Sequence, residues 1–559
     1  TTTIRFRLAP ARTRLGEVVV VATRTGQAAA LNQQKTAPTI GNVIAADQIG
    51  RFPDANLGDA LKRIPGVTVA LDQGEARFGS IRGTEPRFNS VMVNGERVPS
   101  AEAEVREVQL DLVPADMVAA VEVSKTLTPD MDADAIGGAV NVVTRAAPAG
   151  FRLSATTAGG YNAIREQASP IGALVAANRF FGNRLGVIGS ASWFDQQFGS
   201  DNKEGTWDRT DAGAAYMNEF DIRRYDVQRT RRSASLGVDW RFDERNSVMW
   251  RTLYNSRDDW ENRFRLRYIL GEPGTGGVQT AELRRQTKGG GPDDRLRNAR
   301  LEDQRMWSSQ LSGEHLLFGK ASLTWSGTVS AASETRPDER YIEWRARNVA
   351  IRPDYRDEQN PLFTAVTPAQ VQPSAFTFRR IEQLESFTED RDLNGRVDLL
   401  LPLTEGDRAS RVKVGARYRG KEKRRNNSYN FATPVDASAF GNLAQNGLGD
   451  FTVADNLAGN YQYGSFSTPA YLAGLPLFDA ARFRLADQPG EYAAGNFDAD
   501  ERITAGYGML EQRLGRSLSL VAGVRVENTR VDYRGFEFDV DNEIVTPTTG
   551  TQSYTDVLP

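Results

Sequence analysis

The chain has 559 residues, 40% of them hydrophobic, and a mean hydropathy of -0.48, which suits a large ordered structure of two or more domains. Its 69 basic and 72 acidic residues leave a net charge of -3, so no overall field attracts nucleic acid. The absence of cysteine excludes disulfides, zinc knuckles and thiol catalysis. The single histidine, His315, lies in a strand-like run and is interpreted as a wall residue rather than a ligand or base.

The longest aliphatic run is only Val18 to Val21, so the sequence contains no transmembrane helix. A membrane is still possible, because a spanning β-strand needs only about 10 residues of alternating polarity.

The first segment, Thr1 to Pro10, has neither an initiator methionine nor the pattern of a signal peptide, and Ser553 to Pro559 carries no recognisable terminal signal. We therefore expect the sequence to be a fragment. Ile4 to Leu8 alternates like one strand, and residues 1–16 are expected to be a linker or the end of a preceding domain.

Residues 17–34 begin with the extended-chain signal Glu17 to Ala22, in which the four valines Val18 to Val21 favour a β conformation. The polar stretch that follows, as far as about Gln34, predicts an extended tether.

Residues 35–148 predict a small α+β domain. Asn56 and the residues before it can cap a helix, and Leu57, Ala60, Leu61 and Ile64 share one helical face before Pro65-Gly66 ends it. The predicted strands are Val67 to Val69, Gly79 to Arg82, Val91 to Val93 before the turn Asn94-Gly95, Val121 to Val123, and Ala139 to Thr144.

Residues 149–559 consist of strands of roughly ten residues whose polarity alternates. In the clearest run, Leu518 to Thr529, apolar residues lie on one face and polar ones on the other. Similar runs are Leu185 to Trp193, Ala234 to Phe242, Leu323 to Val329, Leu393 to Leu401, Val412 to Tyr418 and Ala505 to Met509. Short turns such as Gly182-Asn183 and Phe318-Gly319 alternate with long connections, as in an antiparallel transmembrane β-barrel.

Two segments partly match metal-binding or nucleotide-binding motifs, but neither match is complete. Asp130 to Asp134 imitates the start of a calcium loop, but Ala135 and Asn141 stand where glycine and glutamate are needed. Gly319-Lys320 lacks the spacing and the hydroxyl of a phosphate loop. We therefore expect no enzyme activity, no metal site and no cofactor.

Four stretches resemble the TonB-dependent receptors of the outer membrane: EVVVVA; Arg51 to Val69; Ile81 to Gly95; and Val121 to Arg145, which includes PDMDADAIGG. The resemblance implies a plug domain inside a barrel of 22 strands, of which about half are present here. It also implies a Gram-negative outer-membrane location, contact with outer-membrane lipid, no nucleic acid partner, and a monomer.

The same resemblance assigns roles to residues. Glu17, Val18, Val19, Val20, Val21 and Ala22 match the TonB box, which pairs as an added strand with TonB, powered by ExbB and ExbD. Arg82 and Arg145 are expected to pair with carboxylates of the barrel wall. Ligand contacts are expected from the outward plug turns, at Asp72, Gln73, Arg77, Glu85, Arg87, Ser100 and Glu102.

The expected function is active uptake of a scarce solute, either an oligosaccharide or an iron chelate. A surface-signalling receptor and a passive porin or adhesin are the alternatives. Aromatic residues of the long connections, among them Trp260, Trp344, Tyr461, Tyr463 and Phe466, could stack on a sugar or simply pack the loops.

Overall fold

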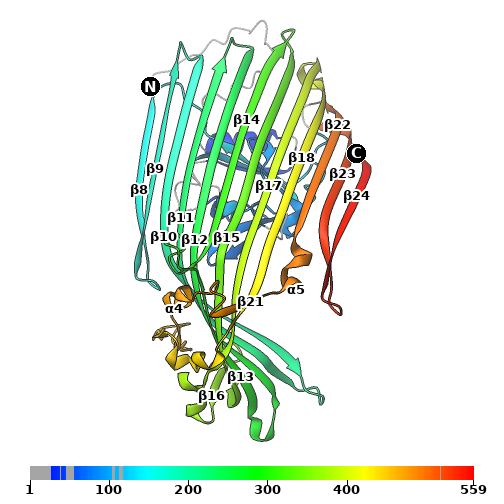
Figure 1. Cartoon of the computed structure of the whole chain (residues 1–559). Helices are drawn as coiled ribbons and strands as arrows, with labels where there is room; N and C mark the ends of the chain where they lie inside the picture. Colours follow the sequence, from blue (N-terminus) through cyan, green and yellow to red (C-terminus); the bar gives the residue numbers. More distant parts are fainter. Residues whose placement is uncertain (1–26, 38, 46–55, 103–106, 113–116, 516–517) are drawn as a thin grey trace.

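The computed structural model describes residues 27–37, 39–45, 56–102, 107–112, 117–515 and 518–559. Glu17 to Ala22 therefore lies outside the described residues. The chain forms a small mixed domain, the plug, on the inner side of a large curved antiparallel sheet, the wall (Figure 1). In the described part of the chain, no helix is both long and apolar enough to cross a bilayer.

A five-stranded sheet in the order β1-β6-β7-β4-β5 organises the plug. Its β4 and β7 run parallel, whereas the other neighbours are antiparallel. The strands span β1 Gly41–Ala45, β4 Asn89–Val93, β5 Glu96–Arg97, β6 Val118–Ser124 and β7 Gly138–Thr144, and a separate hairpin joins β2 Val67–Asp72 to β3 Glu75–Ile81. These strands confirm the predicted ones. The turn at Asn94-Gly95 has positive φ at both residues, 52° and 82°, as a two-residue hairpin requires.

The predicted helix is present as α3 (Leu57–Leu61), and the Asn56 side chain caps it by accepting from the Asp59 N–H at 3.1 Å. Leu57, Leu61 and Ile64 are buried in the plug core. The prediction of an extended tether as far as Gln34 is wrong for its last part, which forms the helix α1 (Gln27–Thr36). Alanine and glutamine favour a helix, and Ala30 packs in a small cluster with Val43 and Ala45.

Gly137 and Gly138 precede β7 at a point where the backbone is crowded. A Cβ on Gly138 would lie 2.6 Å from the Ser124 carbonyl oxygen, and its φ is +144°. A Cβ on Gly137 would meet the side chains of Thr84 and Asn89. Glycine is required here because backbone and side chains approach too closely for any larger residue.

The wall is a 15-stranded sheet whose main path runs β24-β23-β22-β18-β17-β15-β13-β12-β11-β10-β9-β8. Within the described residues, β8 and β24 form its two edges. The strands are β8 Arg152–Asn162, β9 Gln167–Phe180, β10 Leu185–Arg209, β11 Ala215–Arg241, β12 Asn246–Pro273, β13 Gln279–Gly290, β14 Arg300–Leu317, β15 Ala321–Asp354, β16 Leu362–Ala365, β17 Thr377–Thr404, β18 Ser410–Pro434, β21 Phe483–Asp487, β22 Phe497–Arg513, β23 Ser519–Asp539 and β24 Ile544–Leu558.

Short turns join strands at one end of the wall, which we call the inner rim (Figure 1). At the other end the connections vary, from tight turns such as that between β10 and β11 to the long segments between β15 and β17 and between β18 and β22. The turns between β9 and β10, β11 and β12, and β14 and β15 are among the short ones, as predicted. The longest connection lies between β18 and β22 and contains β19 (Leu448–Asp450), β20 (Ser465–Ser467), β21, α4 (Pro469–Gly474) and α5 (Pro489–Tyr492).

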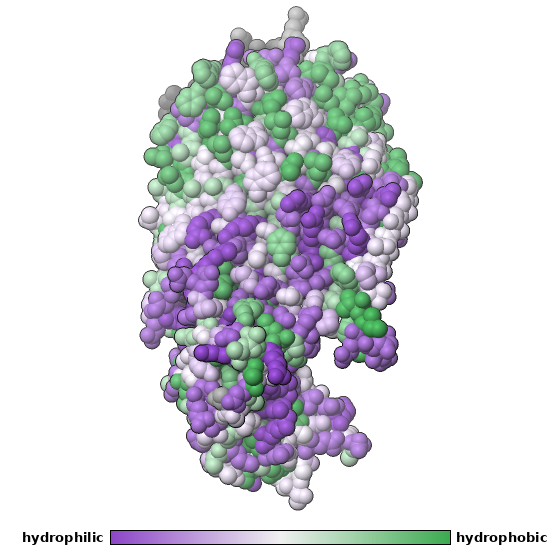
Figure 2. Space-filling model, viewed as in Figure 1, coloured by the Kyte–Doolittle hydropathy of each residue, from purple (hydrophilic) through white to green (hydrophobic). Residues whose placement is uncertain are grey.

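The outer face of the wall carries an apolar belt next to the inner rim. Trp193, Leu236, Trp240, Tyr254 and Trp307 are exposed there. Figure 2 shows this belt above a band of polar side chains. An apolar belt with aromatic residues suits a lipid environment, and the strands continue well beyond it as hydrogen-bonded ladders.

A second hydrophobic core lies at the end of the wall with the long connections. Trp344, Tyr463 and Phe466 are almost fully buried in it, together with Phe264 and Phe376. By strand alternation Phe264 of β12 and Trp344 of β15 point away from the face that carries the plug, and the other three residues belong to the connections. Loop packing therefore accounts for these aromatic residues.

Candidate functional site

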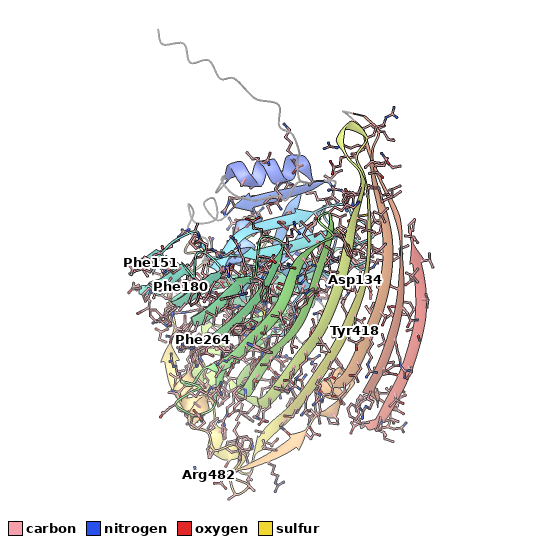
Figure 3. All side chains as sticks on the ribbon, turned by 90° about the horizontal axis from the view of Figure 1, so that it is seen from above. Asp134, Phe151, Phe180, Phe264, Tyr418 and Arg482 are labelled. Atoms are coloured by element: carbon pink, nitrogen blue, oxygen red, sulfur yellow. The ribbon has the colours of Figure 1, made fainter. Side chains whose placement is uncertain are left out.

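The acidic segment before β7 contains the most heavily paired carboxylate of the plug. Asp132 is 5% exposed and pairs with Arg417, Arg419 and Arg525 of the wall at 3.2, 3.4 and 3.4 Å. Asp134 also pairs with Arg419, at 3.5 Å, so the segment meets the wall at β18 and β23 (Figure 3). Two of the residues that imitate a calcium loop therefore pair with arginine side chains. We call Asp132 and Asp134, with Arg417, Arg419 and Arg525, the acidic latch.

Two further plug carboxylates contact the wall. Glu96, which is 1% exposed, pairs with Arg417 at 2.8 Å. Glu75, at the outer end of the plug, accepts from Arg231 at 3.0 Å and also pairs with Arg229 of β11. In these contacts the plug supplies the anions and the wall supplies the cations. Buried pairs of this kind cost much more to break on one side than they contribute as a pair.

Burial alone would raise the pKa of Glu75 and Asp132, but the facing guanidinium groups lower it. Arg231 and Arg229 hold the pKa of Glu75 well below its ordinary range, and Arg419, Arg417 and Arg97 lower that of Asp132. For Asp130, burial is likewise outweighed by the Lys413 ammonium, which lowers the pKa.

Lowered carboxyl pKa values predict a plug that loosens in acid. The stabilisation is fully present above the unfolded pKa of about 4 and is lost as the pH falls through the lower folded values. We expect proteolysis of the plug in the purified protein to be constant from pH 7 to about pH 5 and to accelerate below about pH 4. The same resistance at pH 3 as at pH 7 would contradict this.

The residues predicted to join plug and wall occupy other positions. The Arg82 side chain is exposed and donates to the Gly137 carbonyl at 3.1 Å, within the plug. The Arg145 side chain lines a small cavity between the plug and the wall. Their pairing with wall carboxylates stays a prediction.

Five of the predicted ligand residues gather at the outer end of the plug. Arg77 pairs with Asp72 at 2.7 Å and with Glu102. Gln73 donates to Glu261 of the wall at 2.6 Å, and the Ser100 N–H donates to Asp390 at 3.2 Å. Glu85 and Arg87 lie apart from them as an exposed pair at 2.6 Å. A ligand role for these residues stays a prediction.

Farther from the inner rim than these plug residues, the inner face of the wall is rich in arginine. Arg267, Arg284 and Arg345 are direct neighbours across β12, β13 and β15 and form one row. Arg267 pairs with Asp221 at 2.7 Å and Arg284 with Glu282 at 2.6 Å. In the described part of the chain, the Arg345 guanidinium forms no ion pair within 4.0 Å, although Glu282 lies close enough to interact with it electrostatically.

Next to this arginine row stands Arg265, which faces Arg223 directly across β11 and β12. Arg265 pairs with Glu343 at 3.1 Å and Arg223 with Asp221 at 2.6 Å, so protein carboxylates compensate these two opposed cations. Arg345 is therefore the cation of the row that can receive an anionic group. Sequence reasoning missed these residues, although the alternation of Arg263, Arg265 and Arg267 with apolar residues was readable.

The plug matches a family model described as the TonB-dependent Receptor Plug Domain over residues 33–139. The chain is 31% identical over 121 residues to the vitamin B12 transporter BtuB of Photobacterium profundum, a stretch that is 21% of this chain and 20% of that protein. The siderophore receptor PiuA from Acinetobacter baumannii has the same fold, with a TM-score of 0.52 and 15% identity over 93% of this chain and 62% of that one. The chain thus spans about one fifth of the curated relative and less than two thirds of the solved structure.

Proposed function

Because the chain is a TonB-dependent receptor by its plug domain and its antiparallel wall, we propose that it imports an anionic iron chelate across the outer membrane of a Gram-negative bacterium. In this proposal it binds the solute on the outer side and does no covalent chemistry. TonB, driven by ExbB and ExbD, supplies the force through Glu17 to Ala22, and the barrel works as a monomer surrounded by outer-membrane lipid.

The single observation that carries the choice of solute is the arginine row of Arg267, Arg284 and Arg345. Relatives differ in what they are named for, a siderophore in one case and vitamin B12 in the other, so the solute is argued from this chain's own residues. Guanidinium groups bind carboxylates and other oxyanions through paired, charge-assisted hydrogen bonds. A neutral oligosaccharide would leave the Arg345 guanidinium without an anionic partner, since the other two arginines of the row already pair with Asp221 and Glu282.

Transport requires that the plug move away from part of the wall. The acidic latch and the contacts of Glu75 and Glu96 hold the plug in the resting state, since each separates only at the cost of exposing buried charges. Pulling on the tether supplies the work of moving the plug. The contacts therefore close the barrel without preventing its opening by an external force.

Uptake by cells carrying the complete gene tests the proposal. We expect them to accumulate radiolabelled iron from ferric citrate or from a ferric tris-catecholate, and expect a protonophore to abolish the accumulation. Arg345→Gln should weaken binding of that chelate on the order of tenfold, the contribution of one charge-assisted hydrogen bond. The control is Arg356→Gln, at an exposed loop position, which should bind normally.

Accumulation of a labelled maltooligosaccharide and of neither chelate would contradict the anionic solute. Accumulation that the protonophore leaves unchanged would contradict energy coupling and indicate a passive pore. Chelate binding without accumulation would favour the signalling receptor.

A further inference from the structure

The part of the wall nearest the inner rim presents uncharged side chains to the plug. Ser235 on β11, Ser308 on β14 and Ser330 on β15 lie at neighbouring register positions, with Leu253 of β12 between the first two. By alternation they point to the same side as Arg231 and Arg257, the side of the plug. We call Ser235, Asn255, Ser308, Gln310, Thr328 and Ser330 the uncharged strip.

Several polar atoms of the strip are buried without a protein partner. Both amide atoms of Asn255, which is 1% exposed, make no hydrogen bond. The same holds for the Gln310 Oε1 atom and for the hydroxyls of Thr328 and Ser330. Burying a polar atom in this way costs about 1–3 kcal/mol, so structures rarely keep such groups without a reason. These groups remain available to water or to a passing solute.

A cavity of about 30 Å³ lies between the plug and this strip. Asn94 and Arg145 line it from the plug, and Ser235, Ser308 and Arg251 line it from the wall. The volume admits water but no chelate. In the resting state the strip is therefore closed, and a solute could pass it only after the plug has moved.

The plug is held elsewhere. Its ion pairs with Arg417, Arg419 and Arg525 lie on β18 and β23, and those of Glu75 lie farther out along β11. Moving the plug away from the strip separates hydrogen bonds such as that from Gln310 to the Asn94 carbonyl, at 3.3 Å, and not the charges of the acidic latch. A neutral hydrogen bond contributes about 0.5–1.5 kcal/mol, whereas one-sided loss of a buried ion pair costs about 3–5 kcal/mol.

Strand β12 connects the arginine row to the strip. Arg267, Arg265, Asn255 and Arg251 occupy alternate positions of one face along β12, from the outer end toward the inner rim. Arg251 forms no ion pair within 4.0 Å among the described residues. Between Arg265 and Asn255 the same face carries paired charges, among them Asp259 with Arg257 and Glu261 with Arg300. From Asn255 to Arg251 it carries an unsatisfied polar group and then a cation.

We propose that the inner face of β11, β12, β14 and β15, from Asn255 to Arg251, is the route by which the anionic solute leaves toward the periplasm. This inference rests on the proposed function and adds the path. Asn255 and the hydroxyls of the strip replace solvent hydrogen bonds along the path, and Arg251 receives the anion at its end.

Cysteine labelling tests the route cleanly because the chain has no cysteine of its own. Ser308→Cys lies on the strip, and Thr529→Cys is a matched, buried hydroxyl position on the wall near the acidic latch. Cells making the complete receptor would take up ferric citrate or the ferric tris-catecholate in the presence of anionic sulfonatoethyl methanethiosulfonate. We expect Ser308→Cys to react at least tenfold faster during uptake than with a protonophore, and Thr529→Cys to stay unreactive.

A second variant tests the role of Arg251. Arg251→Gln should slow chelate uptake several-fold while equilibrium binding to the outer side stays unchanged, whereas Arg411→Gln, an exposed rim arginine paired with Glu511, should change neither. Equal labelling of both cysteines, or faster labelling of Thr529→Cys, would overturn the route while leaving the proposed function intact. Unchanged uptake by Arg251→Gln would remove the end point of the route. If the unmodified receptor accumulates neither chelate, the proposed function fails and the route fails with it.

Discussion

Deletion of Glu17 to Ala22 should abolish energy-dependent uptake while chelate binding at the cell surface stays at its normal level. The four valines between Glu17 and Ala22 favour an extended backbone, and an extended backbone can add to the edge of a partner's sheet through its own hydrogen bonds. Without that segment TonB has nothing to pull, although the arginine row is unaffected. The measurement compares initial uptake with binding at 4 °C in the same cells.

A matched control replaces Ile4 to Leu8, another strand-like segment, by an equally long glycine-serine sequence. This variant should take up the chelate at the normal rate, because Glu17 to Ala22 remains. If the deletion lowered binding as well as uptake, the segment would be needed for assembly rather than coupling. Unchanged uptake would contradict a coupled mechanism altogether.

The plug could be predicted from sequence because its signals are local. The cap at Asn56, the apolar face of Leu57 and Leu61, and the turn at Asn94-Gly95 each depend on residues close together in the chain. The helix α1 was missed because the alanine and glutamine composition of this stretch suits either a tether or a short helix. Packing of Ala30 against Val43 and Ala45 stabilises the helix, and this contact is not visible in the local sequence.

The wall strands were located correctly but predicted too short. The predicted segments end with the apolar belt, whereas β15 spans 34 residues in all and continues past the belt as a hydrogen-bonded ladder. Beyond the belt, arginine and glutamate alternate with buried aromatic residues such as Phe264 and Trp344. Their cover comes from the connection between β18 and β22, which no local pattern predicts.

The acidic latch could not be predicted because its partners are distant in sequence. Asp132 and Arg525 meet only when β23 has taken its place in the wall, almost 400 residues later. The sequence offered three carboxylates at alternate positions, a pattern that suits a metal as well as arginine. The resemblance led to a different expectation, in which Arg82 and Arg145 of the plug pair with wall carboxylates, and that expectation stays a prediction. In the acidic latch the carboxylates belong to the plug.

Asp132→Asn should destabilise the docked plug by roughly 3 kcal/mol, because it leaves the guanidinium groups of Arg417, Arg419 and Arg525 buried beside a neutral amide. The amide keeps the size of the carboxylate, so the loss reflects charge rather than a cavity. Arg417, Arg419 and Arg525 each keep one other carboxylate, Glu96, Asp134 and Glu527 respectively, which places the effect at the lower end of the range. Limited proteolysis of the plug in the purified full-length receptor, over a urea series, measures the change.

Asp532→Asn is the matched control, since Asp532 lies on the wall and pairs with Arg530, whose side chain is 56% exposed. Exposed pairs contribute about 0–1 kcal/mol, so this variant should resemble the unmodified receptor. The two variants differ in burial and not in chemistry. Equal, small effects would mean that the acidic latch is solvated and does not hold the plug. A large effect of Asp132→Asn on plug stability combined with faster chelate uptake would show that separation of the acidic latch limits transport. A large effect on stability without faster uptake would mean that the acidic latch stays closed while the plug opens along the uncharged strip.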